Sequence, residues 1–455
     1  MFVNRTKEMQ LLDEEFTHKG ARFIVIYGRR RVGKTRLIEE FIKDKDSVYY
    51  LAALESEAQQ IKELKTLIGR KLNDELILTL ELTDWKQLFS YLEKILPKDK
   101  KMIIVIDEVT FLIKNNSSFV SYLQKFWDQF LSKTNIILIL SGSLVGLIIK
   151  EILAEESPLY GRRTAQIQLE PLLFSHSIEF MKTTFEESIA LYSVTGGIPQ
   201  YLLQIDQPFI QFLKKKFFYK DGFFYQEGQF LLSQEFKDPS TYIDILKAIS
   251  FGNTKLNEIS NFTGIETKIL SRYVDILIEL RLMKRIVPIT EDKDSYRGAI
   301  YKINDNFLSF WHHFVFPNRS SIEIENEEDI KRIMREVNSY IGFVFEDICK
   351  QFLITNQPIS FTNIGTWWDK ENEIDIVAYH HTNKEIFFCE CKWKESVNSD
   401  EILFKLQQKS TLVQWNNQSR KEYFVIFAKS FKNKNQHKNV FLFDLKDIEK
   451  KMKRN

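Results

Sequence analysis

The sequence predicts a multidomain α/β protein, and three observations indicate this fold class. The chain has 455 residues, more than the roughly 250–300 at which single hydrophobic cores stop growing. Hydrophobic residues make up 44% of it, which is enough apolar surface to fill more than one core. Apolar runs alternate with amphipathic helical segments in the first half, as in a buried parallel sheet; the runs are Phe23–Tyr27, Met102–Ile106 and Ile136–Leu140.

Charge and cysteine content indicate the environment of the protein. The 64 Lys and Arg residues against 62 Asp and Glu residues give a formal net charge of +2, so any nucleic-acid-binding surface must be local. The three cysteines have no disulfide-framework spacing, as expected in a reducing compartment. The first residues do not resemble a signal peptide, and no apolar run reaches about 18 residues. We therefore expect a cytoplasmic protein without membrane contact.

The first motif reads GRRRVGKT, from Gly28 to Thr35, and lies between the first apolar run and an amphipathic helix. A strand, a glycine-rich loop and a helix in this order form a phosphate-binding loop. Gly28 and Gly33 let backbone N–H groups surround phosphates at the positive end of the helix dipole. Lys34 would reach the β- and γ-phosphates, and the Thr35 hydroxyl would bind Mg²⁺. The expected ligand is a nucleoside triphosphate, ATP with Mg²⁺.

Two carboxylates, Asp107 and Glu108, directly follow the second apolar run. Asp107 would complete the Mg²⁺ shell, and Glu108 would polarise the attacking water. An acidic pair at this position is also a common way for a loop to begin. The third run ends in a Ser-Gly-Ser triplet, which would place the Ser143 hydroxyl near the γ-phosphate, although such triplets also form simple turns.

A change of pattern after residue 240 predicts a winged helix-turn-helix. Its expected helices are Ile243–Ser250, Lys255–Phe262 and Glu266–Leu280, followed by the strands Met283–Pro288 and Arg297–Ile303. The third helix would present a mildly basic face to DNA. A purely architectural role is equally consistent with the pattern. The expected linkers on either side are Lys214–Gln229 and Ile322–Asp329.

Acidic residues lie on two expected strands near the C-terminus. One strand alternates so that Glu373 and Asp375 share a face, with isoleucines on the other. The next strand would place Glu390 and Lys392 on one face in the same way. Two carboxylates that bind a divalent ion, with a lysine that stabilises developing charge, are the groups that phosphodiester hydrolysis requires. Alternating charges on a half-exposed strand also produce this pattern without any function.

The cysteines Cys389 and Cys391 lie on this second strand and would point to its opposite face. A Cys-x-Cys pair is compatible with zinc binding, but the sequence contains no partner pair at metal-ligand spacing. Free cysteine otherwise behaves as a small apolar residue in protein interiors. We therefore interpret both cysteines as core residues rather than as ligands of a metal.

Six segments occur in order in the first half of the chain: Phe2–Arg5, the phosphate-binding loop, Val105–Glu108, Leu140–Ser143, Pro158–Thr164 and Thr195–Pro199. Together they resemble the archaeal-type ATPases, an offshoot of the AAA+ and STAND NTPases. The resemblance implies that Asn4, Arg5 and Pro199 lie against the base of the nucleotide. It also implies that Arg162 is a γ-phosphate or arginine-finger residue, whereas an arginine that anchors its own loop is about equally consistent.

Four further segments follow: Phe343–Glu346, Gly365–Trp368, Glu373–Asp375 and Glu390–Trp393. They resemble the restriction-endonuclease-like PD-(D/E)xK domain that many archaeal-type ATPases carry at their C-terminus. The resemblance implies that Asp375, Glu390 and Lys392 form a metal-dependent centre that binds Mg²⁺ or Mn²⁺. Glu346, on the preceding helix, would supply a third acidic group. Ile374 stands where the motif has proline, a position that varies widely in this superfamily.

These features predict three domains: an AAA+-like P-loop ATPase domain with a helical lid at 1–235, a winged helix at 236–320 and an α/β nuclease-like domain at 325–455. The leading hypothesis is a DNA-directed ATPase in which hydrolysis controls access of the C-terminal site to DNA. The alternative is a nucleotide-switched signalling or scaffold protein whose last two domains bind without cutting. The expected partners are ATP, DNA, and a second copy of the chain or another protein.

Overall fold

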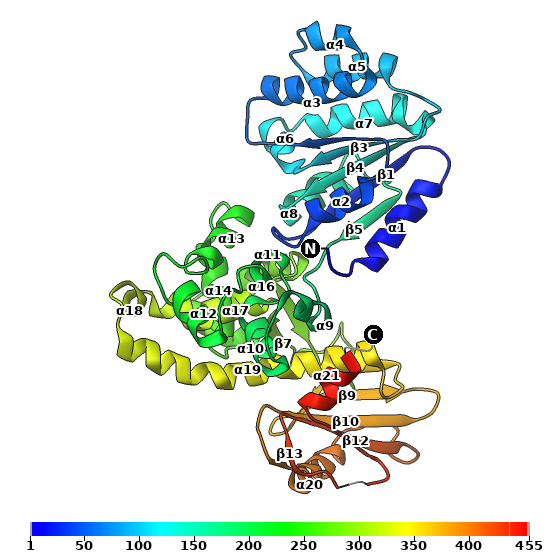
Figure 1. Ribbon diagram of the computed structural model, residues 1–455. Coiled ribbons are helices and arrows are strands. Elements are labelled where there is room, and N and C mark those ends of the chain that lie inside the picture. The colour runs from blue at the N-terminus through cyan, green and yellow to red at the C-terminus, as the bar shows by residue number, and fades with distance from the viewer. Residues whose placement is uncertain (1, 436, 453–455) are drawn as a thin grey trace. The chain divides into compact units, whose positions relative to one another are not determined.

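The computed structural model describes residues 2–435 and 437–452. The chain forms two compact units (Figure 1). The first comprises Met1–Pro171 with Ile198–Gln200, and the second comprises Leu172–Gly197 with Tyr201–Asn455. Among the helices of the described residues, none combines the length and the apolar character that a membrane span requires.

A five-stranded sheet in the order β2-β3-β4-β1-β5 forms the centre of the first unit (Figure 1). All four neighbouring pairs are parallel, as the sequence predicts. Nearly every residue of the three central strands is buried, which explains why their apolar runs do not alternate with polar residues. The strands are β1 (Arg22–Tyr27), β2 (Ser47–Leu51), β3 (Met102–Asp107), β4 (Ile136–Gly142) and β5 (Ala165–Gln168).

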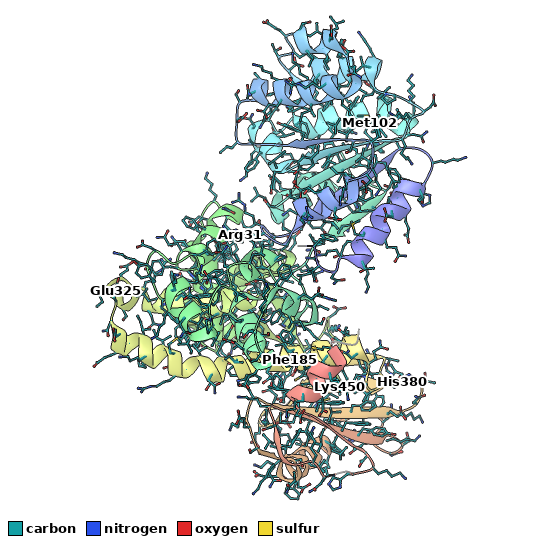
Figure 2. All side chains as sticks on the ribbon, viewed as in Figure 1. Arg31, Met102, Phe185, Glu325, His380 and Lys450 are labelled. Carbon is teal, nitrogen blue, oxygen red and sulfur yellow. The ribbon has the colours of Figure 1, made fainter. Side chains whose placement is uncertain are left out.

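Helices cover both faces of this sheet. Leu12 and Phe41 pack with Ile24 on one face, and Phe23 contacts Trp127 on the other, since consecutive strand residues point in opposite directions. Met102 is buried at the start of β3 (Figure 2). The helices are α1 (Thr6–Thr17), α2 (Lys34–Ile42), α3 (Glu57–Leu72), α4 (Glu75–Thr79), α5 (Trp85–Ile95), α6 (Thr110–Asn115), α7 (Phe119–Gln129), η1 (Leu131–Lys133), α8 (Val145–Ile148) and η2 (Ile149–Leu153).

Aromatic side chains fill the core of the helical part of the second unit. Phe217 and Phe224 are buried and stack with ring centroids 4.5 Å apart, and both contact Phe307. The expectation of a linker at Lys214–Gln229 is therefore wrong, because these rings anchor the stretch in a core. The helices are α9 (Phe174–Ser177), η3 (Ile178–Phe180), α10 (Phe185–Thr195), α11 (Pro199–Leu202), α12 (Phe209–Lys216), α13 (Glu227–Glu235), α17 (Asn306–Phe310), η4 (Trp311–Val315), η5 (Phe316–Asn318) and α18 (Arg319–Glu323).

Residues 240–303 form three helices and an antiparallel hairpin, here named the helix–hairpin segment. Gly264 ends the second helix with φ of 73°, a left-handed conformation that glycine adopts without strain. Arg285 donates hydrogen bonds to the carbonyl oxygens of Lys293 and Tyr296, which folds the loop of the hairpin. The elements are α14 (Ser240–Ser250), α15 (Leu256–Thr263), α16 (Thr267–Glu279), β6 (Met283–Ile286) and β7 (Ile300–Ile303).

A mixed five-stranded sheet, in the order β14-β12-β10-β9-β8, forms the C-terminal part of the second unit (Figure 1). Its pairs are antiparallel from β8 to β10 and parallel from β10 to β14. The 30-residue helix α19 packs on β9 and β10. The elements are α19 (Glu327–Asn356), β8 (Asn363–Trp368), β9 (Glu373–His380), β10 (Glu385–Lys392), β11 (Val397–Asn398), α20 (Ser399–Ser410), β12 (Lys421–Ala428), β13 (Phe431–Asn433), β14 (Val440–Phe443) and α21 (Leu445–Met452).

The alternation of side chains along β9 is interrupted near its start. Ile374 and Val377 both belong to the core cluster that includes Leu403 of α20, although residues three apart in a regular strand face opposite sides. The pairing of β8 with β9 changes register between Gly365 and Trp367, as at a β-bulge. The prediction of strict alternation over this strand is therefore wrong.

A buried histidine in the second unit makes stability depend on pH. His312 is buried beside Trp311, and within the described residues neither of its ring nitrogens has a hydrogen-bond partner. Burial, followed by the charges of Arg319 and Lys247, lowers its pKa from 6.5 to about 3. The unfolded chain therefore binds more protons than the folded chain between these two pH values, so stability is lost as the pH falls through this window.

Replacing His312 by Phe should remove this pH dependence. Lowering the pH from 7 to 5 should destabilise the wild type by about 2 kcal/mol more than His312→Phe, since one pKa unit corresponds to about 1.4 kcal/mol. Urea unfolding followed by tryptophan fluorescence at both pH values measures this difference. An equal loss of stability in the two proteins would contradict a neutral, buried ring.

Candidate functional site

The glycine-rich loop joins β1 to α2 in the first unit. Gly28 has φ of 152°, and a Cβ atom there would lie 2.3 Å from the carbonyl oxygen of Leu169. Gly33 has φ of 97° as the N-cap of α2, and among the described residues no side chain caps this helix. Both positions therefore require glycine, and the first backbone N–H groups of α2 remain directed at the loop, where an anion would lie.

Lys34 lies over the same loop. Its Nζ atom donates to the carbonyl oxygens of Gly28 at 3.0 Å and Arg29 at 3.2 Å, and the side chain is 5% exposed. An ammonium group held against two loop carbonyls is close to the place where the loop would surround phosphates. The structure thus brings together the glycines and the lysine that the motif predicts.

The carboxylate of Asp107 is the centre of a buried hydrogen-bond cluster. It lies at the end of β3 with no exposed surface. Its Oδ2 atom accepts a bond of 2.8 Å from the Thr35 hydroxyl and one of 2.7 Å from the Tyr49 hydroxyl. Its Oδ1 atom accepts from the backbone N–H of Glu108 at 2.9 Å. The two expected Mg²⁺ ligands, Thr35 and Asp107, are therefore in direct contact.

Sequence reasoning did not identify Tyr49. This residue lies on β2 beside Val105 of β3, and burial followed by the charge of Asp107 raises its pKa. Its hydroxyl therefore remains protonated and is the donor in the hydrogen bond to the Asp107 carboxylate. The available signal was a tyrosine on the strand that neighbours β3, the strand that carries Asp107. This signal can be interpreted only when the order of the strands is known.

Glu108 and Ser143 also meet, as expected. The Glu108 Oε2 atom accepts from the Ser143 hydroxyl at 2.7 Å and from the Ser143 backbone N–H at 3.2 Å. Glu108 has φ of 53°, a left-handed conformation that is uncommon for a residue with a Cβ atom. Such backbone strain often accompanies functional positions. The strands β3 and β4 are neighbours, which is why two residues distant in sequence share this edge of the sheet.

The predicted base-side residues Arg5 and Pro199 lie near the loop. Arg5 donates to the carbonyl oxygens of Val32 at 3.1 Å and Glu170 at 2.8 Å. Burial lowers its pKa, and Glu8 partly offsets this effect. A Cβ atom added to Gly33 would come within 3.9 Å of the Pro199 ring. Arg5 therefore braces the loop through its backbone.

Asn4, the third residue of the predicted base side, is exposed and adopts φ of 57°. It lines a shallow cavity along α1 with Phe2 and Thr6. The side chain of Asn4 is therefore accessible beside the buried Arg5. The two residues of the Asn-Arg pair differ in this respect, because only the arginine reaches back to the loop carbonyls.

Arg162 anchors its own loop. Its guanidinium makes two bonds of 2.8 Å to the carboxylate of Asp128 and further bonds to the carbonyl oxygens of Pro158 and Tyr160. The bond to Asp128 is the main cause that raises its pKa. Of the two interpretations that the sequence allows, this geometry corresponds to the loop anchor, and the catalytic role remains a prediction.

The residues of the first unit fit a nucleotide with a divalent cation. The loop offers N–H groups and an ammonium for phosphates, and the adjoining hydroxyl and carboxylate are the hard oxygen ligands that Mg²⁺ prefers. The Asp107 Oδ2 atom accepts hydrogen bonds from two hydroxyls. A bound cation would compete with these hydroxyls for the same oxygen. The site therefore contains the groups that binding of a triphosphate with Mg²⁺ requires.

The second predicted centre lies where β9 and β10 separate. The Asp375 Oδ2 atom accepts a hydrogen bond of 2.7 Å from the backbone N–H of Cys391. This side-chain bond stands where a backbone bond would continue the pairing of the two strands. Glu390 is 7% exposed and its carboxylate binds Lys392 at 2.6 Å and Lys409 at 3.4 Å. Lys409, on α20, was not identified from the sequence, because only the fold brings it to β10.

Glu346 of α19 and Asp375 line the same cavity. Burial is the main cause that raises its pKa, followed by the charge of Asp375, and burial followed by Glu390 raises the pKa of Asp375. The charge of Asp375 thus opposes that of Glu346, and the charge of Glu390 opposes that of Asp375. Within the described ranges, however, no set of three or more His, Cys, Asp or Glu groups converges closely enough to hold a metal ion.

The cysteines of β10 lie in the core, on the face towards α19. Cys389 and Cys391 are buried and unbridged, and the Cys391 thiol shares a hydrogen bond with Cys349 of α19. Burial raises the pKa of both β10 thiols well above the usual value. Their observed environment is that of apolar packing residues.

The fold and the first site together define a P-loop ATPase. A family model described as an ATPase domain predominantly from Archaea matches residues 2–205, and a model of archaeal and bacterial proteins of unknown function matches residues 311–403. An uncharacterized protein of Methanocaldococcus jannaschii is 38% identical over 456 residues, which cover 98% of this chain and 100% of the relative. The chain therefore belongs to the archaeal ATPase family, and it is an ATP-binding and ATP-hydrolysing enzyme.

Two further comparisons agree with this assignment. An uncharacterized ATP-binding protein of Pyrococcus horikoshii is 25% identical over 239 residues, 45% of this chain and 74% of the relative. The solved structure of a Walker-type ATPase of Pyrococcus abyssi has a TM-score of 0.52 and 21% identity, and the match covers 68% of this chain and 96% of that chain. The second comparison concerns the fold alone.

Removing the Tyr49 hydroxyl should reduce ATP hydrolysis. Tyr49→Phe deletes one of the two side-chain donors to Asp107, and the loss of such an orienting partner typically costs about 10–100-fold in metal affinity or activity. Tyr50→Phe is the matched control, since the buried Tyr50 hydroxyl has no hydrogen-bond partner within the described residues. Steady-state phosphate release measured across Mg²⁺ concentrations tests the pair. Equal rates in both variants would remove Tyr49 from the site.

Proposed function

We propose that the chain is an ATPase whose cycle controls a nucleic-acid-directed C-terminal site. Residues 1–235 would bind and hydrolyse ATP, residues 236–320 would form a winged helix, and residues 325–455 would form the nuclease-like domain. The contact between Thr35 and Asp107, with Glu108 held by Ser143 next to it, carries the proposal for the first site. A hydroxyl in contact with a carboxylate, next to a second carboxylate, supports a cation-binding pair and a base at one edge of the sheet.

Each residue of the first site has a separate proposed task. Lys34 binds the β- and γ-phosphates, and Thr35 and Asp107 bind Mg²⁺, which neutralises developing charge when bound. Glu108 accepts a proton from the attacking water while Ser143 fixes the direction of its carboxylate. Asn4, Arg5 and Pro199 contact the base side of the nucleotide.

Arg162 has a conditional task. A role towards a γ-phosphate, in this copy or in a neighbouring copy of the chain, requires that its two bonds to Asp128 first break. A paired guanidinium that must be released would make such a role dependent on the state of the protein. In the paired state, Arg162 stabilises its own loop.

The ATP site should separate binding from chemistry. Lys34→Ala should abolish tight ATP binding, because the loop loses the side-chain cation that reaches the phosphates. Glu108→Gln should bind ATP almost normally but hydrolyse it roughly 100-fold or more slowly, since the base is lost. Calorimetric ATP titration and phosphate release measure the two quantities. A similar loss of affinity in both variants would refute the assigned tasks.

For the C-terminal site, we propose metal-dependent cleavage of DNA. Its support is the meeting of Asp375, Glu390 and Lys392 where two strands separate. Carboxylates that repel one another in a partly buried site favour a bound cation, which would lower their mutual repulsion. Mg²⁺ or Mn²⁺ would be held by Asp375 and Glu390 and by the nearby Glu346, and a bound cation would polarise the phosphodiester. Lys392 would stabilise the charge that develops.

A second function is a nucleotide-switched scaffold whose C-terminal domain binds without cutting. The observation that favours it is the pairing of Glu390 with both Lys392 and Lys409. A carboxylate neutralised by two ammonium groups has less need of a cation. In this alternative the helix–hairpin segment is architectural. Cleavage assays with divalent ions distinguish the two functions.

The wild-type chain should nick plasmid DNA with Mg²⁺ or Mn²⁺, and chelation should stop the reaction. Asp375→Ala and Glu390→Ala should each reduce cleavage at least 100-fold while ATP hydrolysis continues. Glu385→Ala, at the opposite end of the strand that carries Glu390, is the matched control and should cleave normally. Absence of cleavage of single- and double-stranded DNA and RNA with either ion would leave the scaffold function.

A further inference from the structure

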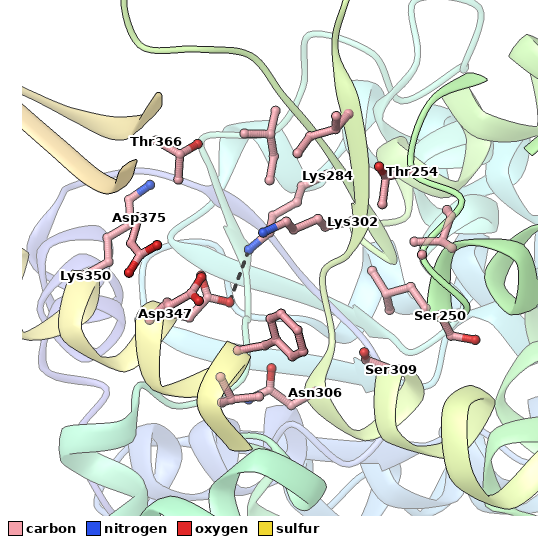
Figure 3. A pocket seen from close by; sticks show the side chains of 18 of the residues that line it. Ser250, Thr254, Lys284, Lys302, Asn306, Ser309, Asp347, Lys350, Thr366 and Asp375 are labelled. Atoms are coloured by element: carbon pink, nitrogen blue, oxygen red, sulfur yellow. Dashed lines mark ion pairs between the residues drawn. The ribbon is translucent and has the colours of Figure 1, made fainter. Parts of the chain in front are cut away.

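A cavity of about 940 Å³ lies within the second unit beside the proposed C-terminal centre. The hairpin β6–β7 forms one wall, α19 a second, and the start of the C-terminal sheet a third (Figure 3). Asp375 and Glu346 belong to the lining, so the cavity gives access to the carboxylates. Figure 3 shows Lys284 and Lys302 extending from the hairpin towards Asp347, with Lys350 and Asp375 together on the opposite side.

The loop of the hairpin is attached to the C-terminal sheet. The backbone N–H of Ile289 donates to the carbonyl oxygen of Thr366 on β8 at 2.8 Å, and its side chain lies against Gly365, where an added Cβ atom would come within 3.0 Å. The Lys284 ammonium makes an ion pair of 3.6 Å with Asp347 of α19. The hairpin thus closes one side of the cavity.

Four lysines and one arginine line the cavity together with six carboxylates. In the part of the chain that the structure describes, the ammonium groups of Lys302 and Lys350 form no ion pair or hydrogen bond. Burial lowers the pKa of Lys350; Asp347 opposes this effect, whereas the charges of Lys284 and Lys302 add to it. An ammonium group that faces a cavity without a direct ionic partner can bind a phosphate oxygen of a ligand.

An exposed aromatic residue lies on the wall that α19 forms. Phe343 of α19 lines the cavity and is 67% exposed, so its ring is accessible to a ligand. Phe343, Asp347 and Lys350 are spaced by four and three residues, so they share one face of α19. This face of α19 therefore carries an apolar ring and, about two turns further along, an ammonium group.

We propose that this cavity binds a short single-stranded nucleic-acid segment, with a base stacked on Phe343 and its phosphates held by Lys302 and Lys350. An aromatic ring with cationic groups beside it is the arrangement by which proteins bind single strands. The inference rests on the proposed nucleic-acid-directed function and names its substrate class. A nucleic-acid strand bound in this way would run past the carboxylate of Asp375, which lines the same cavity.

The size of the cavity favours a single strand over continuous duplex. A volume near 940 Å³ is that of a site for a small ligand, on the order of 300–1,000 Å³. Specific duplex interfaces bury about 1,000–2,500 Å² of protein surface on an open face. The attached hairpin covers one side of the carboxylates, which favours an unpaired end, a flap, a gap or a locally unpaired stretch of supercoiled plasmid as the strand that reaches them.

Fluorescence anisotropy with the full chain tests the proposal without any cleavage. The probes are a labelled seven-nucleotide single-stranded DNA and its blunt duplex, with a chelator and excess ADP present. The wild type should bind the single strand at least tenfold more tightly than the duplex. Phe343→Ala and Lys350→Ala should each weaken single-strand binding roughly tenfold, the scale expected for loss of a stacked base or a phosphate contact.

Phe230→Ala and Lys220→Ala are the matched controls. They remove an exposed ring and an exposed ammonium from the helical part of the second unit, away from the cavity lining, and should leave single-strand binding unchanged. Unchanged circular dichroism and an unchanged thermal unfolding transition in all four variants would show that they fold.

Three results would overturn the inference: equal affinity for duplex, loss of binding only in the control variants, or competition by deoxyadenosine monophosphate as strong as by the oligonucleotide. Cleavage of duplex without single-strand preference would refute it while the proposed function stands. Single-strand binding that depends on Phe343, in a chain that never cleaves, would support it while the nuclease function fails.

Discussion

The burial of one charged carboxylate constrains the first unit. Asp107 has no exposed surface, and a charge taken from water must be compensated by donors in good geometry. Its donors come from three places: the start of α2, the middle of β2 and the backbone that follows β3. The order of the sheet and the position of the phosphate-binding loop are therefore fixed by the same group.

The second unit handles its acidic groups differently. Glu390 is paired by lysines from β10 and α20, and Asp375 is bound by a backbone N–H, but Glu346 depends on more distant charges. A change of register in β9 at this point releases Asp375 from the regular strand pattern. The first unit thus satisfies its carboxylate internally, whereas the second leaves charge that a ligand could compensate.

Local patterns in the sequence predicted local structure well. The loop from Gly28 to Thr35 and the carboxylates after β3 lie where the motifs indicate, because each motif is defined by neighbours along the chain. Patterns that depend on partners failed or were silent. The aromatic residues Phe217 and Phe224 looked like part of a linker because nothing local shows that they meet Phe307.

The same reason explains the residues that sequence reasoning missed. Tyr49 and Lys409 become part of a site only through strand order and a helix crossover. The irregularity in β9 depends on its pairing with β8, so alternation alone could not reveal it. For Arg162 the sequence allowed two interpretations, and only the position of Asp128 on a separate helix distinguishes between them.

The helix α19 is about 45 Å long, since its 30 residues each rise about 1.5 Å. Near its middle, Tyr340 donates to the carbonyl oxygen of Asn306 in the aromatic core, and further along Cys349 packs under the C-terminal sheet. A single rigid rod therefore belongs to two cores at once. Recombination that exchanged the last part of the gene for another would have to preserve both faces of this rod. An exchange of the C-terminal sheet would therefore have to include the helical core that shares α19 with it.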